Sequence, residues 1–559
     1  MKISIFKNIV FIIFITININ LASAQLQLLK TYKLEANSAS SSPLPSNSVS
    51  QIAVVESTIW IGTSQGLAKS IDAGMTWISF KDNSKFANKG IYAIAVSGKT
   101  IWASTGFSKK TKEGTFPTGS GYTFSTDNGE TWDHVNQTLD NKDSSIISYG
   151  INDSIWILPI VVPEQNVTYD ISLSPSAVWI ASWASGLRQS TDNGMHWRRI
   201  LLPLDQMNTI KPTDTLWTYA GYDTAKQHRI YPRFDPRGTP DIPNDNLKAF
   251  SVCAVDDDTI WCGTAGGVNK STDGGNSWIK FTHKNQINGS PILANWVIAI
   301  RLQRFQGKNR IWTTNWLGTE KIDTGQQVGV SYTDDGGRTW INLLHGIKAY
   351  DFAFKDSIAY IATENGIYRT PDGGRSFQRI SNTVSTTGGS LTISNAVSII
   401  DSSTHQAITS SVFLCAGVIG DAVILGTGDG IARTIDNQDN PFGSNWKIYR
   451  TYDRVGNSRM TYAYPNPFAP NAELVRIHYG TKSTNFSSVE RNVRIDIFDF
   501  GMNKIRTLIN NAKRPSSIEL DELWDGRDDE ERIVANGVYF YRVSVDNDVP
   551  LYGKILVLQ

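Results

Sequence analysis

Side chains that could bind a ligand gather in one long segment, 202–246, of the 559-residue chain. Its aromatic, basic and acidic members include Trp217, Tyr222, His228, Arg229, Tyr231, Arg233, Asp235 and Arg237. Flat rings stack on sugars or peptide groups, and a guanidinium pairs with carboxylates through two N–H groups. The composition therefore predicts a binding segment. The alternative is an insert that packs over the channel or an adjacent domain.

Hydrolysis is a second chemistry that this segment could support. Its acids Asp235, Asp241 and Asp245 could include a glycosidase pair. The 7 histidines show no metal-ligand spacing, and the sequence contains neither a G-x-S-x-G nucleophile motif nor a phosphate loop. We therefore predict no metal, no cofactor and no catalytic residues. A non-enzymatic binding protein is favoured, and a glycoside hydrolase is the alternative.

A short repeated motif must position these loops. It reads Ser/Thr-x-Asp-x-Gly-x-Thr/Ser-aromatic, with small departures, and its aspartates are Asp72, Asp127, Asp192, Asp273, Asp335, Asp372 and, in a copy stretched by an insertion, Asp436. Asp can accept backbone N–H groups in a tight turn, Gly supplies a positive φ, and the aromatic ring covers the turn from the core side. The motif predicts a structural turn rather than a catalytic carboxylate.

The strands around the motif indicate the architecture. Ahead of Asp72 lie three short apolar runs, 50–55, 58–63 and 66–69, and similar runs precede the other copies. Seven units of four antiparallel strands predict an all-β fold with a seven-bladed propeller over 25–455. Residues 147–160 carry no motif, so we interpret them as an insertion rather than an eighth blade.

The motif resembles the Asp-box (BNR repeat) of sialidase-like β-propellers. That resemblance implies the fold. The arginine triad and the Tyr–Glu pair that would accompany sialidase activity are not recognisable. In such a ring the long connections between strands share the face opposite the boxes, where we expect a glycan or protein partner to bind. Trp296, Trp312 and Trp316 are predicted to be strand core, with Trp316 alternatively at the channel mouth.

The three cysteines form neither a disulfide framework nor a zinc site. In a hairpin that turns at 257–258, Cys253 and Cys262 would fall opposite each other, so they could form a disulfide. The alternative is that both are small core residues. Cys415 is predicted to be buried in a strand without a partner.

The first 24 residues indicate export. Lys2 and Lys7 precede an apolar run over 9–17 and the small residues 22–24, which is typical of a signal peptide. No later run reaches the ~20 apolar residues of a transmembrane helix. The chain has a formal charge of +1, and removing 1–24 takes away two lysines. The mature surface is therefore near neutral, which disfavours nucleic acid as a partner. We expect a location outside a Gram-negative cell or on its outer membrane.

Residues 456–559 form a second predicted domain. Alternating strands over 475–479, 493–499 and 537–543 predict a small β-sandwich. The segments 464–468, 524–528 and 536–539 resemble the immunoglobulin-like domain of the flagellar hook-capping protein, which is similar to type IX secretion sorting domains. Glu531 departs from that pattern, where Gly is common. The resemblance implies contact with secretion machinery, and a stabilising accessory domain is the alternative.

Overall fold

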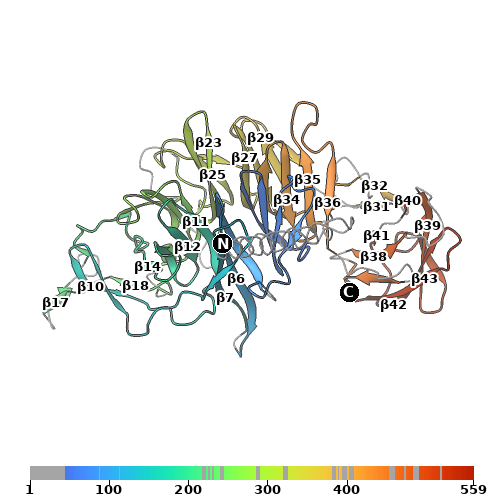
Figure 1. Ribbon diagram of the computed structural model, residues 1–559, viewed down its shortest axis with the longest axis horizontal. Coiled ribbons are helices and arrows are strands. Elements are labelled where there is room, and N and C mark those ends of the chain that lie inside the picture. The colour runs from blue at the N-terminus through green and yellow to red at the C-terminus, as the bar shows by residue number, and fades with distance from the viewer. Residues whose placement is uncertain are drawn as a thin grey trace, which may run out of the picture. The chain divides into compact units, whose positions relative to one another are not determined.

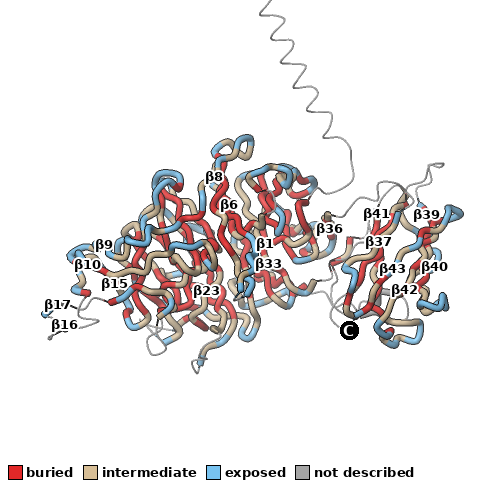
Figure 2. Tube along the Cα trace, turned by 90° about the horizontal axis from the view of Figure 1, so that it is seen from below, coloured by how far each residue is buried: buried red, intermediate tan, exposed pale blue. Residues whose placement is uncertain are grey.

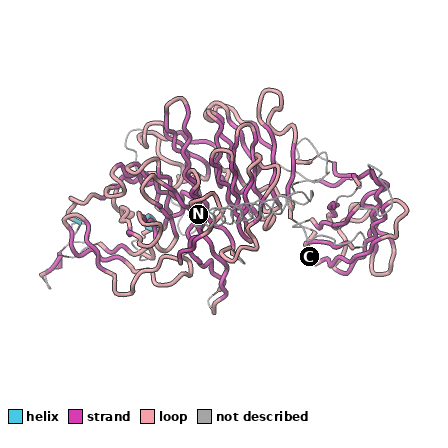
Figure 3. Tube along the Cα trace, in the orientation of Figure 1, coloured by secondary structure: helices cyan, strands magenta, loops and turns pink. Residues whose placement is uncertain are grey.

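The computed structural model describes residues 44–558 apart from short internal gaps at 87–88, 113, 217–221, 224–226, 230–231, 239–243, 285–289, 319–324, 381–384, 388–389, 393–398, 402–407, 409, 452–459, 471–473, 482–489 and 517–518. The predicted signal peptide lies outside these residues. So does the segment around 455, so the boundary between the two domains stays a prediction. Strands and loops make up almost all of the described chain, as Figure 3 shows. Among the described residues, no helix has the length and apolar character needed to span a bilayer.

The described residues contain seven successive four-stranded antiparallel blades, in agreement with the predicted propeller. Within each blade the strands pair in chain order, and we call them a to d from the inside outward. The first three blades consist of β1 (Val49–Val55), β2 (Thr58–Thr63), β3 (Gly66–Ser70) and β4 (Ile78–Ser79); β5 (Gly90–Ser97), β6 (Thr100–Lys110), β7 (Thr115–Ser125) and β8 (Asp133–Val135); and β11 (Thr168–Leu173), β12 (Val178–Ser182), β13 (Gly186–Ser190) and β14 (Arg198–Arg199).

The remaining four blades follow the same order, and the fourth gains an extra edge strand, β15 (Thr209–Ile210). They consist of β19 (Ala249–Ala254), β20 (Thr259–Thr264), β21 (Gly267–Thr272) and β22 (Trp278–Phe281); β23 (Trp296–Phe305), β24 (Lys308–Trp316), β25 (Gly329–Thr333) and β26 (Ile341–Leu343); β27 (Ala349–Lys355), β28 (Ile358–Thr363), β29 (Gly366–Thr370) and β30 (Gln378–Ile380); and β33 (Phe413–Ile419), β34 (Ala422–Thr427), β35 (Gly430–Ile435) and β36 (Trp446–Tyr449).

The ring closes by direct contact between the first and last blades. Their innermost strands, β1 and β33, lie against each other (Figure 2), as do the innermost strands of every other neighbouring pair, such as β23 and β27 (Figure 1). The Arg433 Nε donates to the Ala73 carbonyl at 2.7 Å across this junction.

Aromatic rings fill the spaces between neighbouring blades. Trp60 and Trp261, on the b strands of the first and fourth blades, are almost fully buried. The motif tryptophan of each following blade packs on them, with ring centroids 5.9 Å apart for Trp132 and Trp60 and 6.2 Å for Trp340 and Trp261. Figure 2 shows this burial in red along the inner strands. Each motif therefore joins its own blade to the preceding one.

The segments inserted before the third and the fourth blade together form one small sheet. β9 (Ile146–Tyr149), β10 (Asn152–Ile157) and β18 (Arg233–Phe234) make a three-stranded sheet, with β18 parallel to β10. Ile155 and Phe234 share a core with the third and fourth blades. A sheet of three strands without a box agrees with the interpretation of 147–160 as an insertion. Smaller elements are β16 (Tyr222–Asp223), β17 (His228–Arg229), η3 (Asp245–Leu247), β31 (Ser385–Thr387) and β32 (Ser390–Thr392).

The carboxyl-terminal domain is a β-sandwich, as predicted. One sheet has the order β37 (Thr461–Tyr464), β38 (Val475–Gly480) and β41 (Glu519–Trp524). The other has the order β40 (Lys504–Pro515), β39 (Glu490–Phe498), β42 (Gly537–Val545) and β43 (Leu551–Val557). Phe468, Trp524 and Tyr541 lie in the core between them.

Candidate functional site

The motif turns occupy one end of the blades. In the first, the Ser70 hydroxyl donates to the Asp72 carboxylate at 2.8 Å and accepts from the Gly74 N–H, and the Thr76 N–H donates to the same carboxylate. Gly74 has φ +81°, which explains the glycine. Corresponding bonds surround Asp127, Asp192, Asp273, Asp335 and Asp372. The carboxylates of these six aspartates accept hydrogen bonds within their own turns.

Asp436, the aspartate of the stretched copy, has different partners. It is buried and accepts from the Tyr360 hydroxyl and, at 2.6 Å, from the Arg369 Nε of the sixth blade. The N–H group four residues on, that of Asn440, donates instead to the Asn437 side chain at 2.8 Å. This carboxylate therefore links two blades rather than closing its own turn.

The opposite end of the blades carries a repeated irregularity that the sequence analysis missed. In each blade the pairing between strands a and b shifts register near the start of strand a. The residues skipped by the pairing are Ser50, Tyr92, Tyr169, Phe250, Ile298 with Ala299, Tyr350 and Leu414. A β-bulge turns its extra side chain away from the regular alternation. All of these residues line one cavity in the channel, with a volume of about 770 Å³.

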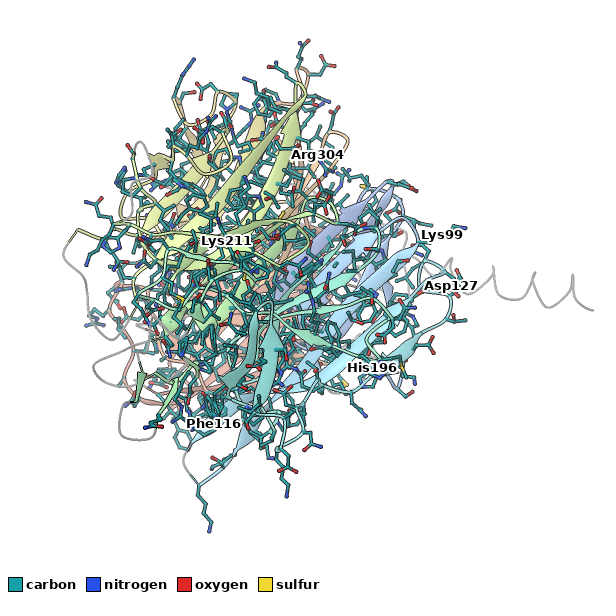
Figure 4. All side chains as sticks on the ribbon, turned by 90° about the vertical axis from the view of Figure 1, so that its left-hand side faces the viewer. Lys99, Phe116, Asp127, His196, Lys211 and Arg304 are labelled. Carbon is teal, nitrogen blue, oxygen red and sulfur yellow. The ribbon has the colours of Figure 1, made fainter. Side chains whose placement is uncertain are left out.

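We call this cavity the channel cup. Its position follows from the topology, because the starts of the a strands and the ends of the b strands lie at the end of the blades away from the boxes. Figure 4 illustrates the two ends in the second blade: Lys99 and Asp127 lie together, and Phe116, on the long β6–β7 hairpin, lies far from them. Phe107 and Ser108 of that hairpin line the cup. The cup therefore opens on the predicted long-loop face.

An arc of aromatic rings forms one wall of the cup. Tyr92, Tyr169, Phe250 and Trp296 come from four successive blades, with neighbouring ring centroids 6.4, 6.3 and 5.4 Å apart. Trp316 of β24 continues the wall against Tyr350 at 5.2 Å. All six line the cup and are half-buried. Trp296 and Trp316, predicted to be strand core, thus lie at the channel mouth, and only Trp312 is buried in the core.

The opposite wall is uncharged and carries several polar groups. These are Ser48, Ser50, Gln51 and Ser64 from the first blade and Ser108 from the second, beside the apolar Ile91 and Leu414. The Ser50 hydroxyl donates to the Ile91 carbonyl at 3.0 Å, which fixes its direction. The cup therefore combines flat apolar surfaces with hydroxyl and amide groups.

A buried ionic cluster lies at the cup's inner surface. Arg301 contacts Asp170 through Nη1 and Asp351 through Nε, each at 2.9 Å. The arginine side chain is 28% exposed and each aspartate side chain is 7% exposed. Burial raises the pKa of both carboxyls, although Arg301 opposes that shift. Burial also disfavours the charged guanidinium, but the two carboxylates outweigh it and raise the pKa of Arg301. The cation and both acids line the cup.

Three of the residues predicted to bind a ligand, Arg233, Asp235 and Arg237, lie outside the cup. Arg233 stacks over the Trp156 ring at 4.1 Å, and Asp235 pairs with Arg237 at 2.6 Å. Tyr222 belongs to β16 and His228 and Arg229 to β17; Trp217 and Tyr231 fall outside the described residues. Ligand binding by this segment stays a prediction.

The strand register contradicts the disulfide considered between Cys253 and Cys262. Cys253 pairs with Trp261, and Cys262 pairs with Val252, so the two cysteines are offset by one residue. Successive side chains of a strand point to opposite faces, and the two thiols accordingly lie in different cores. Both cysteines are free and buried, as is Cys415.

Two of the three acids considered for a glycosidase pair have basic partners. Asp235 is bound to Arg237, Asp245 contacts Lys248 at 2.8 Å, and Asp241 falls outside the described residues. Within the described ranges, no cluster of three or more His, Cys, Asp or Glu side chains could hold a metal ion.

No family model and no curated protein matches the sequence. Among solved structures, the chain is similar to YCF48 from Cyanidioschyzon merolae, with 15% identity, a TM-score of 0.38, and coverage of 70% of this chain and 96% of that one. It is also similar to PorZ, a surface component of the type-IX secretion system of Porphyromonas gingivalis, with 14% identity, a TM-score of 0.34, and coverage of 92% and 66%. An ancestral GH74 enzyme shows 14% identity, a TM-score of 0.27, and coverage of 84% and 79%. At these values the similarities carry no argument about ligand or activity.

Proposed function

We propose that this protein is an exported, non-enzymatic binding protein that holds part of a glycan or protein partner in the channel cup. The observation that carries the proposal is the aromatic wall on the long-loop face, where bulged tyrosine and phenylalanine side chains join the paired Trp296 and Trp316. Ligand pockets are concave and mostly apolar, with a few polar groups that orient the ligand, and volumes of roughly 300–1,000 Å³ are usual. The channel cup has this character.

Ligand screening with matched variants tests the proposal. Trp296→Ala and Tyr169→Ala each remove a wall ring, and Trp156→Ala removes a ring outside the cup as a control. We expect a ligand captured by the wild-type protein to be lost with the first two variants and retained with the third. Retention by all three would contradict binding in the cup.

Hydrolysis of a glycan by a sialidase-like activity is the alternative function. Asp170 and Asp351 are the acids that line the cup, and both are held by Arg301. A screen against sialosides and polysaccharides, with Asp170→Asn and Asp351→Asn, tests it. Turnover that either variant abolishes would replace the binding proposal with the enzymatic one.

We also propose that the sandwich domain is a sorting domain, which secretion machinery recognises. Its support is the resemblance of 464–468, 524–528 and 536–539, together with the leader expected at 1–24. Deleting 461–559 should leave a folded propeller inside the cell envelope, because the two domains have separate cores. Cell fractionation and melting of the truncated protein measure the two effects. Normal surface delivery of the truncated chain would exclude the sorting role.

A further inference from the structure

We infer that the ligand of the channel cup is the uncharged part of a glycan, one or more neutral hexose units. This inference rests on the proposed function and names its ligand class. Two features of the cup support it, namely its two unlike walls and the pairing of its charged side chains.

The shape of the walls fits a sugar ring. A pyranose presents C–H groups on its faces and hydroxyl groups around its edge, so it needs a flat apolar surface beside hydrogen-bonding groups. Tyr169, Phe250 and Trp296 supply contiguous flat surfaces, and the serine and glutamine side chains of the first blade supply hydroxyl and amide groups across the cavity. The tyrosine and tryptophan rings carry a polar group beside their apolar faces.

The ionic cluster disfavours an anionic ligand. An isolated arginine in a pocket would attract a carboxylate or a phosphate. Arg301 already contacts two carboxylates at 2.9 Å each, so the cluster has a net negative charge when all three groups are ionised. An incoming anion would meet repulsion from Asp170 and Asp351. A hydroxyl can still accept a hydrogen bond from the partly exposed guanidinium without this penalty.

A cationic ligand is disfavoured by groups at the rim. Aromatic walls could attract an ammonium group through cation–π contacts. One wall ring already has such a partner, because Lys348 lies 5.1 Å from the Trp316 ring centroid. Lys248 lies 5.2 Å from the centroid of Trp183, a ring that packs on Phe250 and Trp296. Arg301 also lines the cavity, where its positive charge offsets the negative charge of one of the two acids. Repulsion from these cations leaves an uncharged ligand as the best match.

The test uses the full-length mature protein and three groups of probes. These are neutral gluco-, galacto- and manno-oligosaccharides; charged oligogalacturonate, sialyllactose and chitosan oligosaccharide; and a peptide library. Array screening is followed by titration calorimetry on wild type, Trp296→Ala, Tyr350→Ser and the control Trp156→Ala. Thermal melting of each variant confirms folding.

We expect a neutral oligosaccharide to bind, with affinity reduced about tenfold or more by Trp296→Ala or Tyr350→Ser and unchanged by Trp156→Ala. Raising salt from about 50 to 500 mM should change this affinity by less than about twofold, because no ligand charge is screened. A charged glycan or a peptide whose binding depends on Trp296 would overturn the inference and leave the proposed function standing. Failure of every probe to depend on Trp296 or Tyr350 would overturn both.

Discussion

Aspartate is used in opposite ways at the two ends of the propeller blades. At the box end, Asp192 and Asp372 lie in tight turns, where hydrogen bonds from His196 and from Ser376 lower the pKa of each to about 2. At the cup end, Asp170 is buried and its pKa is raised. The box end repeats one bond pattern in six blades, whereas the bulge at the cup end carries different residue types, with tyrosine in three blades. Under the proposed function, the repeated turns stabilise the ring and the varied bulge residues form the binding surface.

The largest effect on stability is expected when the guanidinium of Arg301 is removed from the ionic cluster in the cup. Arg301→Met leaves Asp170 and Asp351 buried without a partner, so the free energy of unfolding should fall by about 3–5 kcal/mol at neutral pH. Without the cation, the pKa values of both carboxyls should rise further above their unfolded values. The loss should therefore be smaller at pH 5 than at pH 8, because the folded variant binds protons that the unfolded chain has released.

Urea denaturation at the two pH values measures this effect. Arg304→Met is the matched control, since Arg304 lies on the same strand and its exposed side chain donates to the Val255 carbonyl at 3.0 Å. A loss as small as that of the control would mean that the ionic cluster contributes little to the stability of the ring.

A box aspartate should affect stability and leave binding unchanged. Asp273 accepts hydrogen bonds from Ser271 and from the Asn276 and Ser277 N–H groups. Asp273→Ala should lower the free energy of unfolding by about 1–2 kcal/mol. Asp258→Ala, in the neighbouring a–b turn, is the control.

Tyr169→Ala should show the opposite effects to Asp273→Ala, with ligand binding lost and stability nearly unchanged. Urea melts and ligand titrations on the same variants sharpen the comparison. A binding defect in Asp273→Ala of similar size would remove the division between the two ends.

The acid range should distinguish the box aspartates from ordinary surface carboxylates. The pKa values of Asp192 and Asp372 fall from 3.8 to about 2 on folding, so their contribution is complete above pH 3.8 and is lost as the pH falls through about 2. The melting temperature of wild type should therefore decline between about pH 4 and 2. Asp192→Asn/Asp372→Asn should decline less steeply, because amides do not titrate. Equal slopes in differential scanning calorimetry would contradict the assignment.

The sequence predicted the box end well and the cup poorly, for physical reasons. Each box consists of a local bond pattern over seven or eight residues, so Asp72 and Gly74 identify it wherever it occurs. The cup requires side chains from blades far apart in the chain, and a bulge moves each one out of the alternation by which buried and exposed positions are recognised. Tyr169 and Tyr350 each precede an aspartate near the start of strand a, and this Tyr-Asp pair is a signal that could have indicated the cup. The offset of Cys253 and Cys262 had no such signal, because it depends on the length of one turn.

The smallest effect is expected from reducing agents. Cys253 and Cys262 lie in different cores and form no bond, so a reductant should leave the melting temperature of the oxidised and reduced protein the same. Burial raises the pKa of the Cys253 thiol to about 12, so at pH 8 almost no reactive thiolate is present in the folded protein. A thiol reagent should modify none of the three cysteines in the native protein within minutes and all three after denaturation in guanidinium. A reductant-sensitive melting temperature, or only one reactive thiol in the unfolded chain, would instead show that the fourth blade can shift its register and pair the two cysteines.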